Sequence, residues 1–225
     1  MVKNKLRKFA ENLTFPNLFQ PTVEEVREGF MLKGNWNRNF FNNDHPIVLE
    51  LGCGKGEYTI ALAKKYPEKN FIGIDIKGAR LWRGAKNSQL GNLSNVAFIK
   101  SYIGFIEELF GTNEVSEIWI TFPDPQPRMK QVKKRLTSPR FLDHYKNIML
   151  PGGIINLKTD NVELFDFTLR EIERNNYGLI ESTKDLYATD PDSEVAEVQT
   201  FYEQMFLKKG MKINYLKFRL GQEND

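Results

Sequence analysis

A glycine-rich segment preceded by an acid is the first part of this sequence whose residue types could perform chemistry. Its sequence is Glu50-Leu-Gly52-Cys-Gly54-Lys-Gly56. Glycines let a backbone turn sharply and approach a ligand closely. The spacing is G-x-G-x-G, which differs from the G-x-G-x-x-G of dinucleotide-binding folds. Because the Glu50 carboxylate would repel a pyrophosphate, the segment disfavours a nicotinamide dehydrogenase and predicts a ligand of a different charge.

A second acid, Asp75, follows Gly52 by 23 residues and ends a predicted buried strand. An acid in this position of a nucleotide-binding fold accepts hydrogen bonds from ribose hydroxyls. Glu50 can hold an ammonium group, directly or through water, while the free amides that open the next helix face the ligand. S-adenosylmethionine, cationic at its sulfonium and at its amine, suits both acids. The alternative is a structural glycine turn with Asp75 as the N-cap of the next helix.

A proline-rich segment contains the third candidate acid, Asp124, between Pro123 and Pro125. Proline fixes its own φ and biases the preceding residue toward an extended backbone, so Asp124 is held at the end of a predicted strand. A carboxylate held there matches the N1–H and N2–H₂ donors on the edge of a guanine. The alternative is a rigid turn in which Asp124 is solvated.

Positive charge is concentrated in two short segments. Residues 125–140 contain six cations and no acid, and residues 1–10 contain four more, so the rest of the chain carries −7 against a net charge of +3. Cations beside a predicted reaction centre favour binding to the phosphates of RNA or DNA. The alternative is a solvated charged surface. A solvated surface is also predicted for Lys77, Arg80, Arg83 and Lys86, whose three-residue spacing spreads them around half a helix.

Strand and helix patterns alternate along the chain, which indicates parallel βαβ units and a layered α/β sheet. We predict strands at 47–51, 70–75, 96–99, 117–121 and 153–157, and helices at 57–65, 79–90 and 139–149. Residues 212–220 alternate with period two and predict an antiparallel strand at or beside the sheet edge. We expect one domain over residues 31–225, preceded by a basic arm of residues 1–30.

Composition excludes several classes of protein. Hydrophobic residues make up 40% of the 225 residues, and no apolar run approaches the ~18 residues of a membrane span. The basic N-terminus has no apolar segment behind it, so no secretory signal is expected. The single cysteine, Cys53, cannot form an internal disulfide and is predicted to be a small filler, and two histidines are too few for a Cys/His metal cluster. We therefore expect a cytoplasmic protein with no membrane partner and no metal.

Five segments resemble the bacterial tRNA (guanine-N7)-methyltransferase family. They are LELGCGKGEY, GIDIKGAR, ITFPDPQPRMKQVKKRLT, GGIINLKTDN and TFYEQMFLKKG, all between residues 47 and 220. The glycine segment is shared by many methyltransferases, whereas the bracketed acid, the basic run and the late TFYE, in that order, are specific to this family. The resemblance implies a Rossmann-like class I S-adenosylmethionine-dependent methyltransferase fold, with a mostly parallel seven-stranded sheet and an antiparallel C-terminal strand.

The resemblance also implies roles for single residues. Those implied to bind S-adenosylmethionine are Glu50, Gly52, Gly54, Asp75, Tyr102 and Asp124, and Asp124 is also the implied active-site acid. Those implied to contact the target nucleotide or complete its pocket are Arg128, Asp160, Thr200, Phe201, Tyr202 and Glu203, and those implied to touch tRNA are Lys130, Lys133, Lys134 and Arg135. From the residues alone, Asp160 is equally an N-cap for a helix at 161–175, and Thr200 with Glu203 forms a capping box.

Three positions depart from the family pattern. Tyr102 follows Ser101 where the family commonly has an acid that contacts adenine, so stacking or backbone amides are expected to recognise adenine here. Gln126 replaces a common tryptophan. Arg128 replaces a common lysine, which changes the hydrogen-bonding geometry at that position.

The sequence therefore predicts methyl transfer from S-adenosylmethionine to N7 of a guanine in the variable loop of tRNA, by a monomer or homodimer. The products are 7-methylguanosine and S-adenosylhomocysteine. One alternative is a methyltransferase acting on another RNA or DNA base; enzymes for exocyclic amino groups carry an Asn/Asp-Pro-Pro-aromatic motif, which the segment Pro123-Asp-Pro-Gln126 lacks. The other alternative is a non-catalytic RNA-binding module, which would show no saturable uptake of S-adenosylmethionine.

Overall fold

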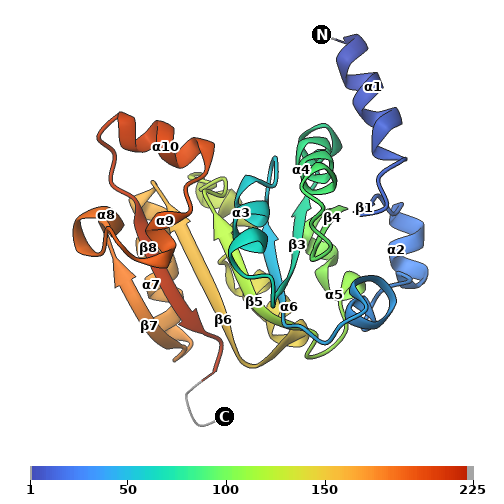
Figure 1. Cartoon of the computed structure of the whole chain (residues 1–225). Coiled ribbons are helices and arrows are strands. Elements are labelled where there is room, and N and C mark those ends of the chain that lie inside the picture. Colours follow the sequence, from blue (N-terminus) through green and yellow to red (C-terminus); the bar gives the residue numbers. More distant parts are fainter. Residues whose placement is uncertain (1, 222–225) are drawn as a thin grey trace.

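One sheet of eight strands, in the order β1-β4-β3-β2-β5-β6-β8-β7, forms the centre of the computed structural model, which describes residues 2–221 (Figure 1). Within these residues β8 alone runs in the direction opposite to all the other strands. The strands are β1 (Leu18–Phe19), β2 (Ile47–Leu51), β3 (Asn70–Asp75), β4 (Val96–Lys100), β5 (Val115–Thr121), β6 (Met149–Thr159), β7 (Gly178–Thr183) and β8 (Asn214–Arg219).

The predicted α/β class and the antiparallel C-terminal strand are confirmed, and the predicted strands at 47–51 and 70–75 match β2 and β3 at both ends. The sheet has eight strands where seven were expected, because the two-residue β1 pairs with β4 at one edge. Strand β7 lacks a predicted counterpart. Most of its residues are exposed, so it has none of the apolar alternation that marks a half-buried strand.

Helices cover both faces of the sheet. Apolar side chains of α2, α5, α6 and α7 pack on one face, and those of α3, α4, α8 and α9 pack on the other. The helical segments are α1 (Val2–Asn12), α2 (Val23–Gly29), a π-helix (Asn37–Phe41), α3 (Glu57–Lys65), α4 (Gly78–Leu90), η2 (Ile103–Phe105), α5 (Ile106–Leu109), η3 (Met129–Lys134), α6 (Pro139–Ile148), α7 (Val162–Arg174), α8 (Leu186–Thr189), α9 (Glu194–Glu197) and α10 (Phe201–Lys208).

The carboxyl ends of the parallel strands form the edge of the sheet at the top of Figure 1, with α10 on one side of this edge and α1 on the other. The strand order reverses between β2 and β5, because β3 and β4 lie beyond β2 while β6 lies beyond β5. In open α/β sheets ligands bind outside the carboxyl ends of the strands at such a reversal.

The expected division into an arm of residues 1–30 and a domain of residues 31–225 stays a prediction. Within the first 30 residues the structure forms α1 and adds β1 to the sheet. It also buries Val26 and Phe30 in the same cluster as the rest of that face.

Close packing between α4 and the glycine segment fixes where the segment lies. A Cβ added to Gly84 of α4 would lie 2.7 Å from Cζ of Phe98 and 2.9 Å from the backbone oxygen of Lys55. The backbone oxygen belongs to the glycine segment and cannot move without it. Gly84 therefore lets α4 approach the segment more closely than any other residue would.

Substituting Gly84 by alanine tests this contact. In an ordinary helix interior Gly→Ala stabilises by about 1 kcal/mol. Here we expect Gly84→Ala to lower the free energy of unfolding by about 1–3 kcal/mol, because overpacking costs that much. Urea denaturation measures the change, with Asn87→Ala on the exposed side of the same helix as the control. A Gly84→Ala protein more stable than the wild type would contradict the close contact.

Candidate functional site

A cavity of about 90 Å³ lies at the point where the strand order reverses. It is bounded by the glycine segment, the end of β5, α4 and the first turn of α10. The residues that line it are Glu50, Gly52, Cys53, Gly54, Lys55, Glu57, Tyr58, Arg80, Thr121, Phe122, Thr200, Phe201 and Tyr202. Six residues predicted for cofactor or substrate, from segments about 150 residues apart in the chain, thus line one cavity.

The glycine segment has the backbone geometry of a ligand cradle. Gly52, Gly54 and Gly56 have φ of 76°, 57° and 69°, in the left-handed region that favours glycine. A Cβ added at Gly52 or Gly54 would meet nothing within 4 Å. Two backbone N–H groups, of Gly52 and Cys53, donate to the carbonyl of Ile74 and hold the turn against β3. The segment therefore leaves open space next to its backbone that a ligand can enter.

Glu50 is buried at the end of β2, with 4% of its surface exposed. Its carboxylate accepts hydrogen bonds from the backbone N–H of Thr59 (2.8 Å), from the Thr59 hydroxyl and from the Thr121 hydroxyl (2.7 Å). Burial raises the pKa of Glu50 to about 7, although these hydrogen bonds act in the opposite direction. A cation next to this buried carboxylate would stabilise its charged form.

Asp75, buried at the end of β3, connects the glycine segment to the start of α4. Its carboxylate accepts from the N–H of Gly54 (2.9 Å) and from the N–H of Lys77 (2.7 Å). The N-cap of α4 is Lys77, which has no side-chain cap, so the alternative of Asp75 as N-cap does not describe this helix. Each carboxylate oxygen of Asp75 retains a lone pair for a ligand hydroxyl.

Tyr102 lies next to Asp75, after β4, where the N–H of Ser101 donates to the Asp75 carbonyl. Tyr102 is 44% exposed, and its ring packs edge-on against Phe105.

Cys53 has a different role. Its buried thiol lies where a Cβ on Gly73 would come within 2.8 Å of the sulfur. Burial and the charges of Glu50 and Asp75 raise the pKa of the Cys53 thiol, which agrees with a packing role.

Asp124 is exposed on the loop that follows β5, and its carboxylate accepts from the N–H of Gln126 at 3.1 Å. The loop is constrained on both sides of this acid. Phe122 and Gln126 have φ of 47° and 46°, which non-glycine residues rarely adopt. The N–H of Phe122 donates to the carbonyl of Lys158 in β6. The loop thus combines a rigid backbone with a solvated carboxylate.

Asp160 follows β6, the neighbour of β5 in the sheet. Since Thr121 pairs with Lys158, the chains leading to Asp124 and Asp160 leave the sheet side by side. The N-cap of α7 is Asn161, whose side chain accepts from the N–H of Leu164. The alternative of Asp160 as N-cap is therefore not what the structure has, and its half-buried carboxyl stays available at the edge.

The first turn of α10 covers the glycine segment. Thr200 and Glu203 form the predicted capping box, in which each side chain accepts from the other residue's backbone N–H. The N–H of Phe201 donates to the Glu57 carboxylate at 3.1 Å, and the Lys55 ammonium lies 4.9 Å from the centre of the Phe201 ring. The rings of Phe201 and Tyr202 are 55% and 47% exposed, so both present aromatic surface beside the cavity.

Glu203 does not line the cavity, because its side chain is completely buried. Its carboxylate lies 2.6 Å from the Lys158 ammonium, with both side chains 0% exposed, and also accepts from the Tyr187 hydroxyl. The same ammonium donates to the carbonyls of Val195 and Val198. Burial lowers the pKa of Lys158, while Glu203 opposes that shift. In this structure Glu203 anchors α10 to β6 and does not face a substrate.

The basic run divides into two parts. Arg128, Lys130, Lys133 and Lys134 are exposed on η3 and its N-cap, beside the Asp124 loop. Arg135 corrects the prediction for that residue. Its guanidinium is buried, donates to the Pro125 carbonyl at 2.9 Å and lies 4.6 Å from the centre of the Phe167 ring. Arg135 therefore supports the loop and is not available to phosphates.

Two cations on the cavity wall have no predicted role in binding. Arg80 of α4, expected on a solvated surface, lies on the cavity wall, and so does Lys55 of the glycine segment. Helical spacing assigns Arg80 to a face of α4. It gives no information on α10, which lies 120 residues further along the chain and closes the cavity opposite. Phe122 is likewise identified only by its backbone angle.

Comparison with known proteins decides the family. A family model described as a putative methyltransferase matches residues 44–216. A tRNA (guanine-N(7)-)-methyltransferase of Christiangramia forsetii is 53% identical over 220 residues, which are 97% of this chain and 98% of that relative. One of Bacteroides thetaiotaomicron is 48% identical over 224 residues, 99% of this chain and 88% of that protein. The chain belongs to the tRNA (guanine-N7)-methyltransferase family.

Solved structures of more distant proteins support the fold assigned to this family member. The 16S rRNA methyltransferase KamB has a TM-score of 0.63 at 14% identity, and the match covers 81% of this chain and 91% of KamB. A 16S rRNA (adenine(1408)-N(1))-methyltransferase from Catenulisporales acidiphilia, solved with SAM, has a TM-score of 0.55 at 13% identity, with 91% and 94% covered. The predicted methyltransferase fold is thereby confirmed.

Two further findings concern residues 2–221. They contain no helix with both the length and the apolar composition to cross a membrane. Nor do they bring together three or more His, Cys, Asp or Glu side chains in a group that could hold a metal ion.

A Glu203→Ala substitution separates anchoring from substrate contact. We expect it to lower the free energy of unfolding by about 3–5 kcal/mol, because the Lys158 ammonium would stay buried without its partner. Chemical denaturation measures this loss. The control is Glu197→Ala, which removes an ion pair with Lys65 whose acid is 66% exposed and should cost at most ~1 kcal/mol. Unchanged stability with weaker RNA binding would contradict the anchoring role.

The raised pKa of Glu50 predicts a pH dependence of stability. Between the ordinary pKa of 4.5 and about 7, the folded protein binds more protons at this group than the unfolded chain does. The stability from Glu50 is thus present below about pH 4.5 and lost as the pH rises through about 7. The free energy of unfolding of the wild type, minus that of Glu50→Gln, should fall by about 2–4 kcal/mol from pH 5 to pH 8. A constant difference across this range would contradict the shift.

Proposed function

We propose that this chain transfers the methyl group of S-adenosylmethionine to N7 of a guanine in the variable loop of tRNA. The products are 7-methylguanosine in the tRNA and S-adenosylhomocysteine. One observation carries the proposal within this family. Glu50, Asp75 and Asp124 lie at the carboxyl ends of three strands, beside the first turn of α10 and the exposed cations of η3.

The residues of the carboxyl edge fit S-adenosylmethionine. The open space at Gly52 and Gly54 admits a ligand against the backbone, and the buried Glu50 carboxylate provides the counter-charge for an ammonium. Asp75 would accept from the ribose hydroxyls, and the half-exposed Tyr102 ring would stack on the adenine. When bound, S-adenosylmethionine supplies an electrophilic methyl group on a sulfonium.

The chemistry at N7 requires no base from the protein. N7 of guanine carries an in-plane lone pair, so no proton has to be removed before it attacks. Positioning alone contributes up to ~7–11 kcal/mol in favourable cases. The Asp124 carboxylate would accept from N1–H and N2–H₂ of the guanine and thereby orient N7. Because the methylated base is a cation, the same carboxylate stabilises the charge that develops on it.

The target base has to leave its stack to reach this carboxylate, at a cost of a few kcal/mol. The exposed rings of Phe201 and Tyr202 provide surfaces on which an extruded base stacks. Asp160, beside the Asp124 loop, and Thr200, at the start of α10, complete the polar lining. These residues would form the nucleotide pocket between β5, β6 and α10.

The RNA backbone would follow the exposed cations beside this pocket. Arg128, Lys130, Lys133 and Lys134 form one group, and Lys55 with Arg80 continues the positive charge across the cavity wall. Contacts from Lys and Arg to phosphates give affinity that falls with salt and does not depend on sequence. Specificity for guanine then depends on Asp124. We further propose that the reaction takes place in the cytoplasm.

An Asp124→Asn substitution tests the proposed function. The amide presents a donor where the guanine edge needs acceptors and carries no charge to stabilise the cationic product. We expect kcat for formation of 7-methylguanosine to fall about 10²–10³-fold, the usual cost of losing one stabilising group. Binding of S-adenosylmethionine, measured by calorimetry, should survive.

The matched control is Asp143→Asn, which alters an acid of α6 that is 69% exposed and pairs with Lys146. This variant should retain wild-type turnover. An active Asp124→Asn enzyme would remove Asp124 from the mechanism. A wild-type protein that takes up no S-adenosylmethionine would overturn the proposed function itself.

A further inference from the structure

Helix α1 is amphipathic, and it contacts the rest of the protein through its polar side. Glu11 accepts from Nε1 of Trp82 and from the Lys86 ammonium, at 2.8 and 2.6 Å. The Asn12 side chain donates to the Gly78 carbonyl at 3.0 Å, and the Lys8 ammonium lies 4.6 Å from the centre of the Trp82 ring. All of these partners belong to α4. The polar side of α1 is thus used in the contact with α4.

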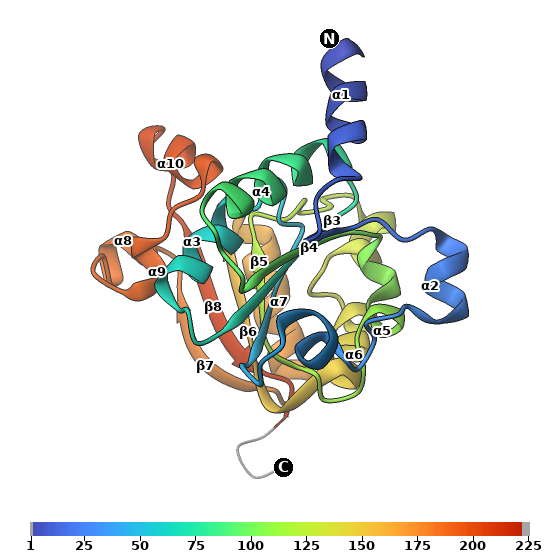
Figure 2. The same cartoon turned by 45° about the vertical axis from the view of Figure 1, so that its right-hand side comes forward.

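The opposite side of α1 is an exposed apolar stripe. Leu6 and Phe9 lie three residues apart on one face of α1, and Leu13, in the turn directly after the helix, continues the same spacing. They are 63%, 37% and 81% exposed. The Lys5 ammonium lies 5.6 Å from the centre of the Phe9 ring and puts a positive charge beside the stripe. Figure 2 shows that α1 stands out from the body, and the exposure of these side chains indicates that the stripe is turned toward solvent.

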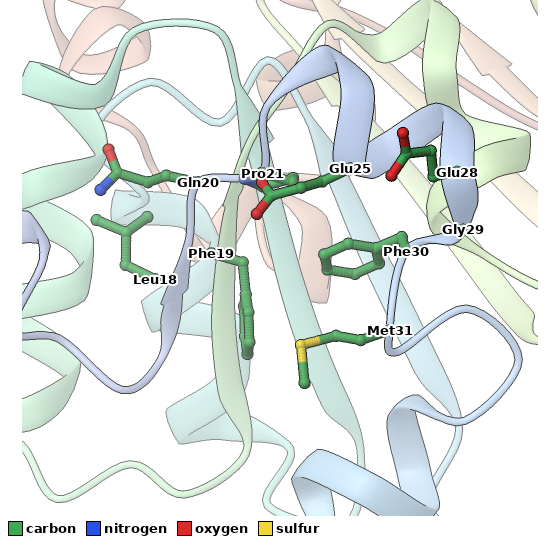
Figure 3. Close-up of a pocket in the computed structure, with 9 residues that line it drawn as sticks. All are labelled: Leu18, Phe19, Gln20, Pro21, Glu25, Glu28, Gly29, Phe30 and Met31. Atoms are coloured by element: carbon green, nitrogen blue, oxygen red, sulfur yellow. The ribbon is translucent and has the colours of Figure 1, made fainter.

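A pocket of matching character lies between β1 and α2. Its volume is about 440 Å³, nearly five times that of the cavity at the glycine segment. Figure 3 shows the side chains of Phe19, Phe30 and Met31 gathered in it, with the carboxylates of Glu25 and Glu28 on the side of α2. Met31 is 77% exposed, so much of this apolar surface is open. The pocket is therefore suited in shape and charge to an apolar segment that carries positive charge.

These two surfaces complement each other and cannot meet within one chain. The stripe is apolar with a cation beside it, and the pocket is apolar with two carboxylates at its rim. The contacts of Glu11 and Asn12 hold α1 on α4, and only residues 13–17 separate α1 from β1, which itself lines the pocket. The occupant of the pocket must therefore come from another molecule.

We propose that α1 of one copy of this chain docks in the β1–α2 pocket of a second copy, and the reverse, to form a two-fold dimer. Figures 1 and 2 show α1, β1 and α2, the elements that carry the two surfaces, together at the β1 end of the sheet. A two-fold rotation would pair each stripe with the other copy's pocket. An amphipathic helix in an apolar groove is a common mode of protein recognition. The proposal goes beyond methyl transfer and does not depend on it.

Sedimentation velocity across a range of protein concentrations tests the dimer. We expect the wild type to associate into a dimer, and expect Leu6→Asp and Met31→Asp each to raise its dissociation constant about tenfold or more. Both side chains are exposed, so neither substitution disturbs the core. The control is Leu90→Asp, which changes a 75% exposed leucine at the end of α4 and should leave the dimer intact.

Charge reversal tests the pairing of the two surfaces. Lys5→Glu and Glu28→Lys should each weaken the dimer, and the double variant should recover at least part of the lost affinity. A wild type that stays monomeric at every concentration would overturn the proposal. So would a dimer insensitive to Leu6→Asp and Met31→Asp. Loss of tRNA affinity in Leu6→Asp, with no change in association, would assign the stripe to RNA and equally overturn the proposal.

Discussion

A carboxylate buried at the end of β2 is the constraint on which the rest of the site depends. Glu50 ends the strand at the reversal of strand order, and its hydrogen bonds reach Thr59 on α3 and Thr121 at the end of β5. One side chain thus joins three elements around the glycine turn. Burying an acid is costly, and three hydrogen bonds offset only part of that cost, as its raised pKa indicates. A cationic ligand beside it would offset more.

A second buried charge fixes the other wall of the cavity. The Lys158 ammonium, paired with Glu203, connects β6 to α10 and to the carbonyls of Val195 and Val198. An unpaired charge there would be strongly destabilising, so this contact specifies one position for the first turn of α10. The rings of Phe201 and Tyr202 are thereby held over the glycine segment. Two buried ionic groups, one on each wall, thus hold the walls of the site in place. The proposed contacts with RNA come from exposed residues.

The sequence predicted the parts of this arrangement that depend on local patterns. Strands β2 and β3 and helix α3 match the prediction at both ends, since apolar runs and glycine turns determine them locally. The roles of Arg135 and Arg80 depend on partners distant in the chain. The η3 turn brings Arg135 against Phe167, and α10 closes the cavity whose wall includes Arg80. The sequence around each arginine therefore could not show that its role differs from that of the neighbouring cations. The exposed stripe of α1 was not predicted either, because the contacts of α1 with α4 decide which side of the helix is exposed.

Analysis of the methylated nucleosides identifies the product and is the decisive test of methylation at N7 of guanine. The protein is incubated with methyl-labelled S-adenosylmethionine and bulk tRNA lacking 7-methylguanosine, and the RNA is then digested and its nucleosides are separated. The geometry at Asp124 predicts that the label appears in 7-methylguanosine. Label in any other nucleoside, or transfer to no nucleoside despite saturable binding of S-adenosylmethionine, would contradict the proposed reaction.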